Sequence, residues 1–476
     1  MGCMKTDILK WEDYKRTVPD WFRDAKFGLF FHWGPYSVPE HGSEWYSRNM
    51  YETGHEQNLF HERTFGKVSK FGYKDFLPMF QGEKFEPAKW AQLVRKAGAK
   101  YAAPVCEHAD NFSLWDSCIN PVNAVKTGPH RDIIGELYRE FRKEGIRCMA
   151  TFHHQWLWGW YMSPNPEADV YRPENRVYYG KVLPVNTKVY IPDQRPDEEF
   201  CAVWRDKVLE VILKYNPDAV YFDSRANLIP DMYKQQVLDA LYRRPDTLVT
   251  YKQYDFPEGV AVVDIECGRF SDCKDFVWQT DDKLEALTTW CYVKNPKYKS
   301  AERIIHQLCD IVSKNGNLLL NVGPKPDGTF DPEAEKTLEE IGSWLSVCGE
   351  AIYGTRPYRT AMEGPTVMKD NNYDVKKMEA QIEMGYMMED TVPDFTSEDI
   401  RFTCKNDILF AILLGWPGDG KAAIRALGLG SGAKKIRSVR MLGIDAPLEF
   451  VQTGKELLIT CPGTKPCKYA YVFRIE

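Results

Sequence analysis

Between residues 15 and 350 the chain carries eight short apolar stretches, most of them separated by segments in which apolar positions recur at helical spacing. The stretches are continuously apolar and do not alternate, which is typical of parallel strands buried on both faces. These predicted strands span residues 27–34, 101–108, 146–154, 219–224, 247–253, 260–266, 288–293 and 317–324. The predicted helices span residues 87–97, 132–144, 197–215, 230–243, 301–313 and 332–347.

Strands interleaved with helices in this way predict an α/β fold, an irregular TIM-like (β/α)8 barrel. The irregularity lies between the fifth and sixth strands, because residues 254–259 are too few to form a helix. An open doubly wound sheet is the competing fold. That fold needs a glycine-rich phosphate-binding turn after its first strand, and His32-Trp33-Gly34-Pro35 does not provide one.

The pattern changes after Gly354. Short strand-like segments separated by glycine- and proline-containing turns follow, and they favour a small antiparallel β-sandwich. These segments span residues 400–404, 408–414, 436–442, 457–461 and 469–475. We therefore predict a catalytic barrel domain over residues 1–354, followed by a linker and a C-terminal β-sandwich domain over residues 355–476.

Composition and charge narrow the classes of function. A net charge of −6 leaves no cationic surplus to neutralise phosphates, so nucleic acid is not an expected partner. No apolar run approaches the ~20 residues of a membrane span, so a membrane is not expected either. The chain has 13 cysteines, no CxxC pair and no apolar signal segment at its start. We expect a cytoplasmic protein with reduced thiols, or a secreted or periplasmic one if a native signal was removed.

Polar and ionisable side chains gather where the predicted strands end, which is where a barrel builds its active site. They are His32, Glu107, His108, His153, His154, Asp223, Lys252, Glu266 and Asn321. Tryptophans such as Trp45, Trp278 and Trp290 lie in neighbouring segments. Aromatic faces suit the C–H faces of sugar rings, and the polar groups suit their hydroxyls, so the mixture favours a carbohydrate ligand.

Two of these strand-end carboxylates, Asp223 and Glu266, suit the cleavage of a glycosidic bond. A retaining glycosidase needs one ionised carboxylate as nucleophile and one protonated carboxyl as acid/base, ~5–5.5 Å apart. We expect Asp223 to be the nucleophile and Glu266 the acid/base. Asp281, Asp282 and Glu285 are rival candidates for the second role.

Several motifs around these positions carry a family resemblance. They include Phe31-His32-Trp33-Gly34, Glu44-Trp45-Tyr46, Glu107-His108, Leu114-Trp115-Asp116-Ser117, Tyr221-Phe222-Asp223, Asp264-Ile265-Glu266, Trp278-Gln279-Thr280-Asp281 and the segments 315–321 and 349–354. In this order and over nearly the whole chain, the sequence resembles the retaining α-L-fucosidases, glycoside hydrolase family 29.

The resemblance implies an exo-glycosidase that hydrolyses terminal α-L-fucosides of oligosaccharides or glycoconjugates by double displacement, without a cofactor. It implies that Asp223 is the nucleophile, that Glu266 is the acid/base, and that copies of the chain can associate into a homo-oligomer. The implied sugar-binding residues are His32, Glu44, Trp45, Glu107, His108, His153 and Trp278. We predict no metal site, because the adjacent His153 and His154 point to opposite sides of a strand.

One departure from the family pattern leaves alternatives open. The family usually has a second histidine after His108, and here Ala109 stands in that place; Asn111 replaces a common glycine. A missing imidazole removes a hydrogen-bond partner of a sugar hydroxyl. The alternatives are a shifted sugar preference, for example an α-L-galactoside, a fucose-binding pseudoenzyme, or compensation by His154 or Glu107.

Overall fold

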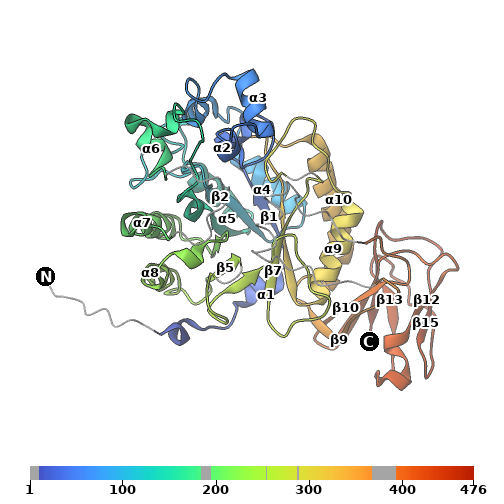
Figure 1. Cartoon of the computed structure of the whole chain (residues 1–476). Helices are drawn as coiled ribbons and strands as arrows, with labels where there is room; N and C mark the ends of the chain where they lie inside the picture. The colour runs from blue at the N-terminus through green and yellow to red at the C-terminus, as the bar shows by residue number, and fades with distance from the viewer. Residues whose placement is uncertain (1–9, 184–194, 253–254, 287–288, 367–392) are drawn as a thin grey trace.

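The computed structural model describes residues 10–183, 195–252, 255–286, 289–366 and 393–476. Eight parallel strands close into a barrel and follow one another around it in chain order (Figure 1). They are β1 (Phe27–Phe31), β2 (Tyr101–Glu107), β3 (Arg147–Phe152), β4 (Ala219–Phe222), β5 (Leu248–Lys252), β6 (Val262–Asp264), β7 (Trp278–Lys283) and β8 (Gly316–Asn321). The predicted TIM-like barrel is confirmed.

All six helices predicted from apolar spacing are present around the barrel, with ends within two residues of the prediction. They are α4 (Pro87–Lys96), α5 (Ile133–Lys143), α7 (Glu198–Tyr215), α8 (Asp231–Leu241), α9 (Ala301–Ser313) and α10 (Pro332–Cys348). Four begin where a side chain caps the first turn, since Asp132, Asp197, Ser300 and Asp331 each accept a backbone N–H there. Among the described residues, no helix is both long and apolar enough to cross a membrane.

The seventh strand does not lie where the apolar pattern placed it. Residues 289–293, the described part of the predicted strand 288–293, form no strand, and β7 lies at Trp278–Lys283 instead. All six residues of β7 are buried although five of them are polar or charged, so an apolar pattern could not reveal this strand. It pairs with β8 from Trp278 opposite Gly316 to Lys283 opposite Asn321. A Cβ atom at Gly316 would lie 2.6 Å from the Trp278 ring, so glycine allows this close approach.

The barrel is irregular on one side, as expected. The described residues between β5 and β6, 255–261, contain no helix, and neither do residues 265–277 between β6 and β7. Only short connections without a helix therefore follow β5 and β6. Lys252 lies at the end of β5, and Glu266 lies just beyond the neighbouring strand β6. Residue Lys252 pairs directly with Asp264 across the two strands.

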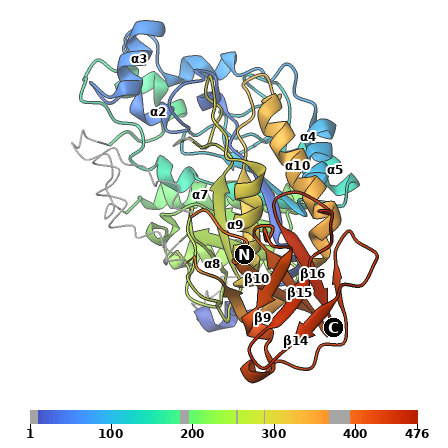
Figure 2. The same cartoon turned by 90° about the vertical axis from the view of Figure 1, so that its right-hand side faces the viewer.

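The C-terminal domain packs two antiparallel sheets face to face, beside α9 and α10 (Figure 2). The sheet orders are β13-β16-β11-β10-β9 and β12-β15-β14. The strands are β9 (Arg356–Glu363), β10 (Ile400–Lys405), β11 (Ile408–Leu413), β12 (Lys421–Ile424), β13 (Val439–Met441), β14 (Phe450–Gln452), β15 (Leu457–Thr460) and β16 (Tyr471–Ile475). Five were predicted; β9, β12 and β14 were missed because they lie at sheet edges and are largely exposed or half-buried.

The two domains share a buried charged contact. The Nε atom of Arg401 on β10 lies 2.6 Å from Oδ1 of Asp310 on α9, and Lys314 Nζ lies 2.7 Å from the other oxygen of the same carboxylate. All three side chains are almost fully buried. The predicted domain boundary at residue 354 falls just before β9.

Candidate active site

The ends of β4, β5 and β6 bring two acids into contact with one lysine. Asp223 follows β4 directly, Lys252 ends β5, and Glu266 lies two residues beyond β6. The Nζ atom of Lys252 lies 2.7 Å from Oδ1 of Asp223 and 2.7 Å from Oε2 of Glu266. Burial alone would lower the pKa of Lys252, but the carboxylates of Asp223, Asp281 and Glu266 raise it well above its ordinary value. Lys252 is therefore a fixed positive charge between two acids.

This shared contact limits the distance between the two acids. Since each oxygen lies 2.7 Å from the same nitrogen, Oδ1 of Asp223 and Oε2 of Glu266 are at most twice that distance, 5.4 Å, apart. Retaining glycosidases hold their two carboxyl groups ~5–5.5 Å apart, whereas inverting enzymes separate them by ~6.5–9.5 Å. The side chains of Asp223 and Glu266 are 14% and 21% exposed, so both acids can be reached from the barrel mouth.

The rival acids occupy different surroundings. Asp281 lies 3.3 Å from Lys252 Nζ, but its side chain is only 1% exposed and accepts a hydrogen bond from the hydroxyl of Tyr221. Burial and the neighbouring charge of Asp264 raise the pKa of Asp281 well above its ordinary value. Asp281 is thus enclosed in the barrel beneath the pair, where a glycosidic oxygen has no access.

Asp282 and Glu285 face away from Lys252. The Asp282 carboxylate contacts Lys299 Nζ at 2.8 Å and accepts a hydrogen bond from Gln307 at 2.7 Å. Despite burial, the Lys299 charge holds the pKa of Asp282 at about 2. Glu285 accepts a hydrogen bond from the backbone N–H of Gly323, and burial raises its pKa to about 7. Of the four acid/base candidates, Glu266 is the exposed one that shares Lys252 with Asp223.

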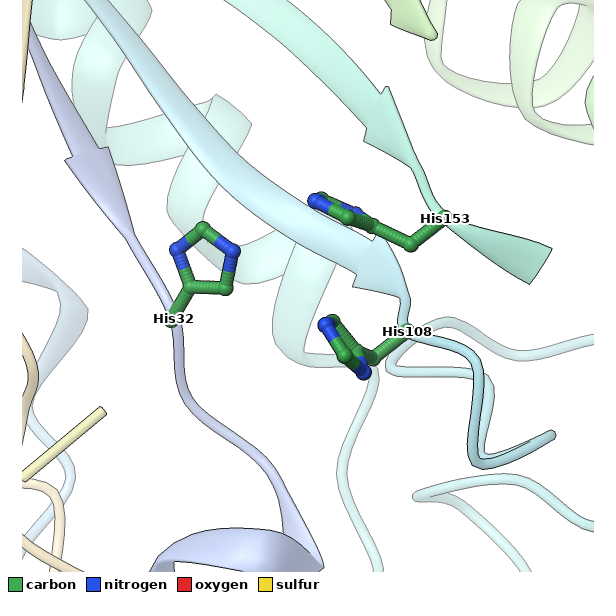
Figure 3. Close-up of side chains that lie close together, drawn as sticks. All are labelled: His32, His108 and His153. Atoms are coloured by element: carbon green, nitrogen blue, oxygen red, sulfur yellow. The ribbon is translucent and has the colours of Figure 1, made fainter. Parts of the chain in front are cut away.

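Three histidines form a second group in the barrel mouth (Figure 3). His32, His108 and His153 each offer one ring nitrogen, and these nitrogens lie within 4.8 Å of one another. Burial lowers the pKa of His32 to about 4 and the pKa values of His108 and His153 well below the ordinary value. All three rings are therefore neutral at pH 7, and a neutral imidazole can donate one hydrogen bond and accept another.

The histidine group has hydrogen-bonding capacity that the protein does not use. His32 is held through Nδ1, which lies 2.8 Å from Oδ1 of Asn321. Among the described residues, the buried Nδ1 atoms of His108 and His153 have no hydrogen-bond partner. A tetrahedral zinc ion bonds its nitrogen ligands at ~2.0–2.1 Å, which places those nitrogens about 3.3 Å from one another. The nitrogens of His32, His108 and His153 are up to 4.8 Å apart. The arrangement fits the hydroxyl groups of a sugar better than a metal ion.

Glu44 and aromatic rings border the histidines. Oε2 of Glu44 accepts the backbone N–H of Trp290 at 2.9 Å, and burial raises the pKa of Glu44 to about 7. The Trp290 ring lies 5.4 Å from the His32 ring, centre to centre. Trp45 packs against Trp160 at 4.8 Å, and Trp160 lies 6.1 Å from His108. These rings give the site the apolar walls expected for a sugar pocket.

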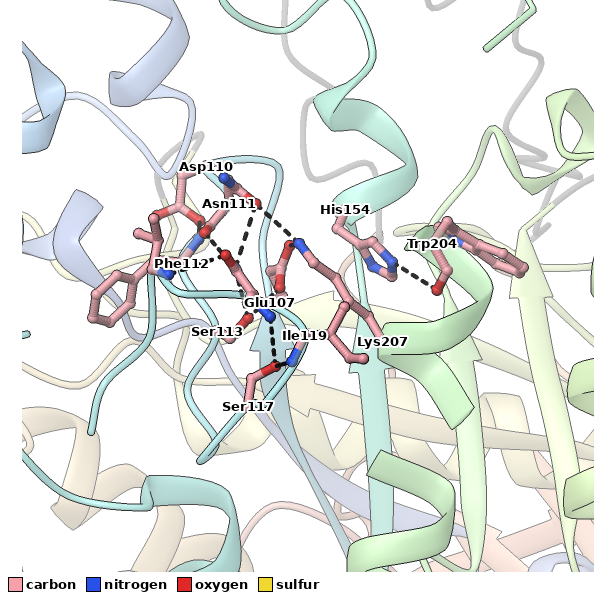
Figure 4. A network of polar contacts seen from close by, with 12 residues as sticks. Glu107, Asp110, Asn111, Phe112, Ser113, Ser117, Ile119, His154, Trp204 and Lys207 are labelled. Carbon is pink, nitrogen blue, oxygen red and sulfur yellow. Dashed lines mark hydrogen bonds and ion pairs between the residues drawn. The ribbon is translucent and has the colours of Figure 1, made fainter. Parts of the chain in front are cut away.

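The structure does not bring Glu107 or Trp278 to this site. Glu107 is fully buried on the helix-facing side of β2, where its carboxylate contacts Lys207 Nζ at 2.6 Å and accepts the Ser113 hydroxyl (Figure 4). His108 faces the barrel instead, because successive strand residues point to opposite sides. Trp278 lies at the amino end of β7, and its indole N–H donates to the Lys314 carbonyl.

The geometry does not support compensation by Glu107 or His154, one of the alternatives that the Ala109 departure left open. The His154 Nε2 atom lies 3.3 Å from the Trp204 carbonyl of α7, on the same outer side of the barrel as Glu107 (Figure 4). Asn111, which replaces the glycine common in the family, has φ of 64° and accepts Lys207 Nζ at 2.9 Å. Asparagine tolerates this left-handed backbone better than most residues, so the substitution keeps the turn.

His154 allows a prediction about stability and pH. Burial lowers its pKa to about 4 from 6.5, so the unfolded chain binds a proton more readily than the folded one. The stability that this adds is present above pH 6.5 and is lost as the pH falls towards 4. The negative charge of nearby Glu107 raises the pKa of His154, and the positive charge of Lys207 lowers it. We expect the free energy of unfolding to decrease by about 2 kcal/mol more in the wild type than in His154→Gln between pH 7 and 5.

Denaturant unfolding of both proteins at each pH measures this difference. Comparing the two is necessary because carboxyl groups with raised pKa values, such as Glu44 and Asp110, change stability in the opposite direction over the same range. A difference between wild type and variant that stays constant from pH 7 to 5 would show that His154 titrates normally.

Comparison with known proteins identifies the family of the chain. Residues 8–350 match the family described as alpha-L-fucosidase, and residues 393–476 match the alpha-L-fucosidase C-terminal domain. The chain is 28% identical to tissue alpha-L-fucosidase of Rattus norvegicus over 97% of this chain and 90% of that protein. It is 27% identical to alpha-L-fucosidase of Branchiostoma floridae, over 97% of this chain and 94% of that protein.

A similar solved structure extends the likeness to three dimensions. Thermotoga maritima alpha-fucosidase in complex with fucose has a TM-score of 0.75 and 28% identity, over 98% of both chains. The same enzyme in complex with a mechanism-based inhibitor has a TM-score of 0.76 and 27% identity, over 98% of this chain and 99% of that one. The family match covers most of the chain and includes both of its domains. The chain therefore belongs to the α-L-fucosidase family.

Proposed function

We propose that this protein hydrolyses terminal α-L-fucosides of oligosaccharides or glycoconjugates with retention of configuration, using Asp223 as nucleophile and Glu266 as acid/base. The family membership supports the fucoside substrate. The observation that carries the mechanism is the shared contact of both carboxylates with Lys252, which keeps them within the spacing of a double displacement.

In the first step, an oxygen of Asp223 attacks the anomeric carbon of the fucosyl unit while the bond from that carbon to the leaving oxygen breaks. Glu266 transfers its proton to the leaving oxygen, so the alcohol departs neutral. In the second step, water attacks the same carbon, Glu266 takes a proton from it, and the bond to Asp223 breaks. Both acids return to their starting states, and fucose leaves with its original configuration.

The histidine group and the tryptophans hold the sugar in this proposal. Nδ1 of His108 and of His153 are buried polar atoms that a sugar hydroxyl would satisfy. His32 and Glu44 are fixed by Asn321 and by the Trp290 backbone, so their free atoms are held in place before substrate arrives. Such prior ordering lowers the entropy cost of binding.

Lys252 is proposed to balance the negative charge of Asp223, and that of Glu266 once Glu266 has given up its proton. Replacing it with methionine keeps most of the side-chain volume and removes the charge. We expect kcat for an aryl α-L-fucoside to fall by about 10²-fold or more, since removing one preorganised charge from an active site typically has an effect of that size. Steady-state kinetics with purified protein measures the loss.

Lys299→Met provides the matched control for this variant. Lys299 is also buried and contacts a carboxylate, Asp282, at 2.8 Å, but it lies on the other side of β7 from the proposed catalytic pair. If Lys299→Met loses as much kcat as Lys252→Met, the loss reflects a disturbed fold and not the charge between the two acids.

The substrate is tested with a panel of aryl glycosides. The proposal predicts that 4-nitrophenol is released fastest from the α-L-fucoside. A faster reaction with the α-L-galactoside would establish the shifted sugar preference that Ala109 leaves open. Binding of fucose in a calorimeter without turnover of any glycoside would establish the pseudoenzyme. Ala109→His, which restores the usual second histidine, shows in either case whether this position limits rate or affinity.

A further inference from the structure

Two cysteines from different domains lie in contact. Cys348 is the last residue of α10 in the barrel domain, and Cys467 lies in the segment that precedes β16 in the C-terminal domain. Their Sγ atoms are 3.8 Å apart. We propose that Cys348 and Cys467 form an oxidisable dithiol, a modification site at which a disulfide links the catalytic barrel to the β-sandwich. This inference is independent of the proposed fucosidase mechanism.

The segment that carries Cys467 is docked on the barrel by several contacts. The indole N–H of Trp344, one turn before Cys348, donates to the Ala470 carbonyl at 2.8 Å. The Tyr469 hydroxyl donates to Glu340 of α10 at 2.7 Å. The His306 ring of α9 lies 3.1 Å from the Tyr469 carbonyl. Because these contacts hold the two segments together next to the pair, the two sulfurs are neighbours through the fold itself.

The two thiols have complementary environments. Cys467 is half-buried, so a small oxidant can reach it, whereas Cys348 is buried behind it. The hydrogen bond from Cys348 lowers the pKa of Cys467 and raises the pKa of Cys348. Cys467 is thus the thiol that gives up its proton first, and the thiolate is the form that attacks a disulfide.

Oxidised glutathione is a suitable oxidant, and the reaction balances as follows. The Cys467 thiolate attacks one sulfur of oxidised glutathione, forming a mixed disulfide and releasing one glutathione thiolate. Cys348 then loses its proton and attacks the Cys467 sulfur, which releases the second glutathione. Two protein thiols are oxidised to one disulfide, and one oxidised glutathione is reduced to two thiols. The sulfurs must approach from 3.8 Å to the ~2.05 Å of a disulfide bond.

The test treats the purified full-length protein with oxidised glutathione, digests it with trypsin without reduction, and identifies linked peptides by mass spectrometry. Trypsin does not cut before proline, so it releases Cys348 in residues 337–359 and Cys467 in residues 456–468. We expect these two peptides to be joined. Since residues 456–468 also contain Cys461, the link must persist in Cys461→Ser and disappear in Cys467→Ser.

Two further results would overturn the proposal. One is the absence of this link while the exposed Cys118 becomes glutathionylated, since the reagent is then shown to be active. The other is a link through Cys309, which trypsin releases in residues 304–314.

A disulfide between Cys348 and Cys467 should also raise the thermal midpoint of the protein by at least about 3 °C. An equal rise in Cys348→Ser would show that oxidation acts elsewhere.

Discussion

Replacing Asp223 with glycine is expected to lower the rate of aryl α-L-fucoside hydrolysis by at least about 10³-fold, because the first step then has no nucleophile. The glycine leaves a space beside the anomeric carbon that a small anion can enter. Sodium azide should therefore restore turnover and yield fucosyl azide of inverted, β configuration. Rates are measured by release of the aryl group, and the configuration of the product by proton NMR.

Asp445→Asn is the control for this experiment, since Asp445 is an exposed carboxylate in the C-terminal domain. It should retain the wild-type rate with and without azide. Full activity of Asp223→Gly would contradict the assignment directly. Azide rescue that gives the α-configured product would also contradict it, because attack would then come from the face where the leaving group departs.

Replacing Glu266 with glutamine is expected to have an effect that depends on the leaving group. For a fucoside with a poor leaving group, such as a simple alcohol, kcat/KM should fall by about 10³-fold, since the leaving oxygen must be protonated. For a 2,4-dinitrophenyl fucoside, whose leaving group departs without a proton, the loss should be about 10-fold or less. Steady-state kinetics on both substrates gives the ratio.

The same pair of substrates separates Glu266 from its rivals. Asp282→Asn and Glu285→Gln remove carboxylates that contact Lys299 and the Gly323 backbone, away from Lys252. Any loss of activity in these variants should be equal for both leaving groups, as expected for a disturbed fold. If one of them shows the strong dependence on leaving group and Glu266→Gln does not, the acid/base has been assigned to the wrong residue.

Most of the fold could be predicted because its elements carry local signals. The six barrel helices were found from apolar spacing, and four of them start at a capping Asp or Ser. β7 was missed for a functional reason. Its Gln279 and Asp281 point into the barrel, where they contact Asp264 and Lys252, so the strand is polar although it is buried. The apolar criterion fails where charged side chains are stabilised by one another.

The sequence predicted which strand ends form the candidate site, but it predicted less well which side chains point into it. Asp223, Glu266, His32, His108 and His153 do lie together in the barrel mouth. Glu107 could have been excluded from the sequence, because it precedes His108 on a strand and must face the opposite side. The bridging position of Lys252 depends on three separate strand ends meeting in space, which no local pattern reports.

Covalent trapping tests the central assignment most directly. A 2-fluorinated fucosyl fluoride forms the glycosyl-enzyme by loss of fluoride, while its ring fluorine slows the second step, so the sugar stays attached to the nucleophile. Trypsin releases Asp223 in residues 215–225 and Glu266 in residues 253–269. Mass spectrometry should find the fluorofucosyl group on Asp223. Its attachment to Glu266 or to any other carboxylate would contradict the mechanism.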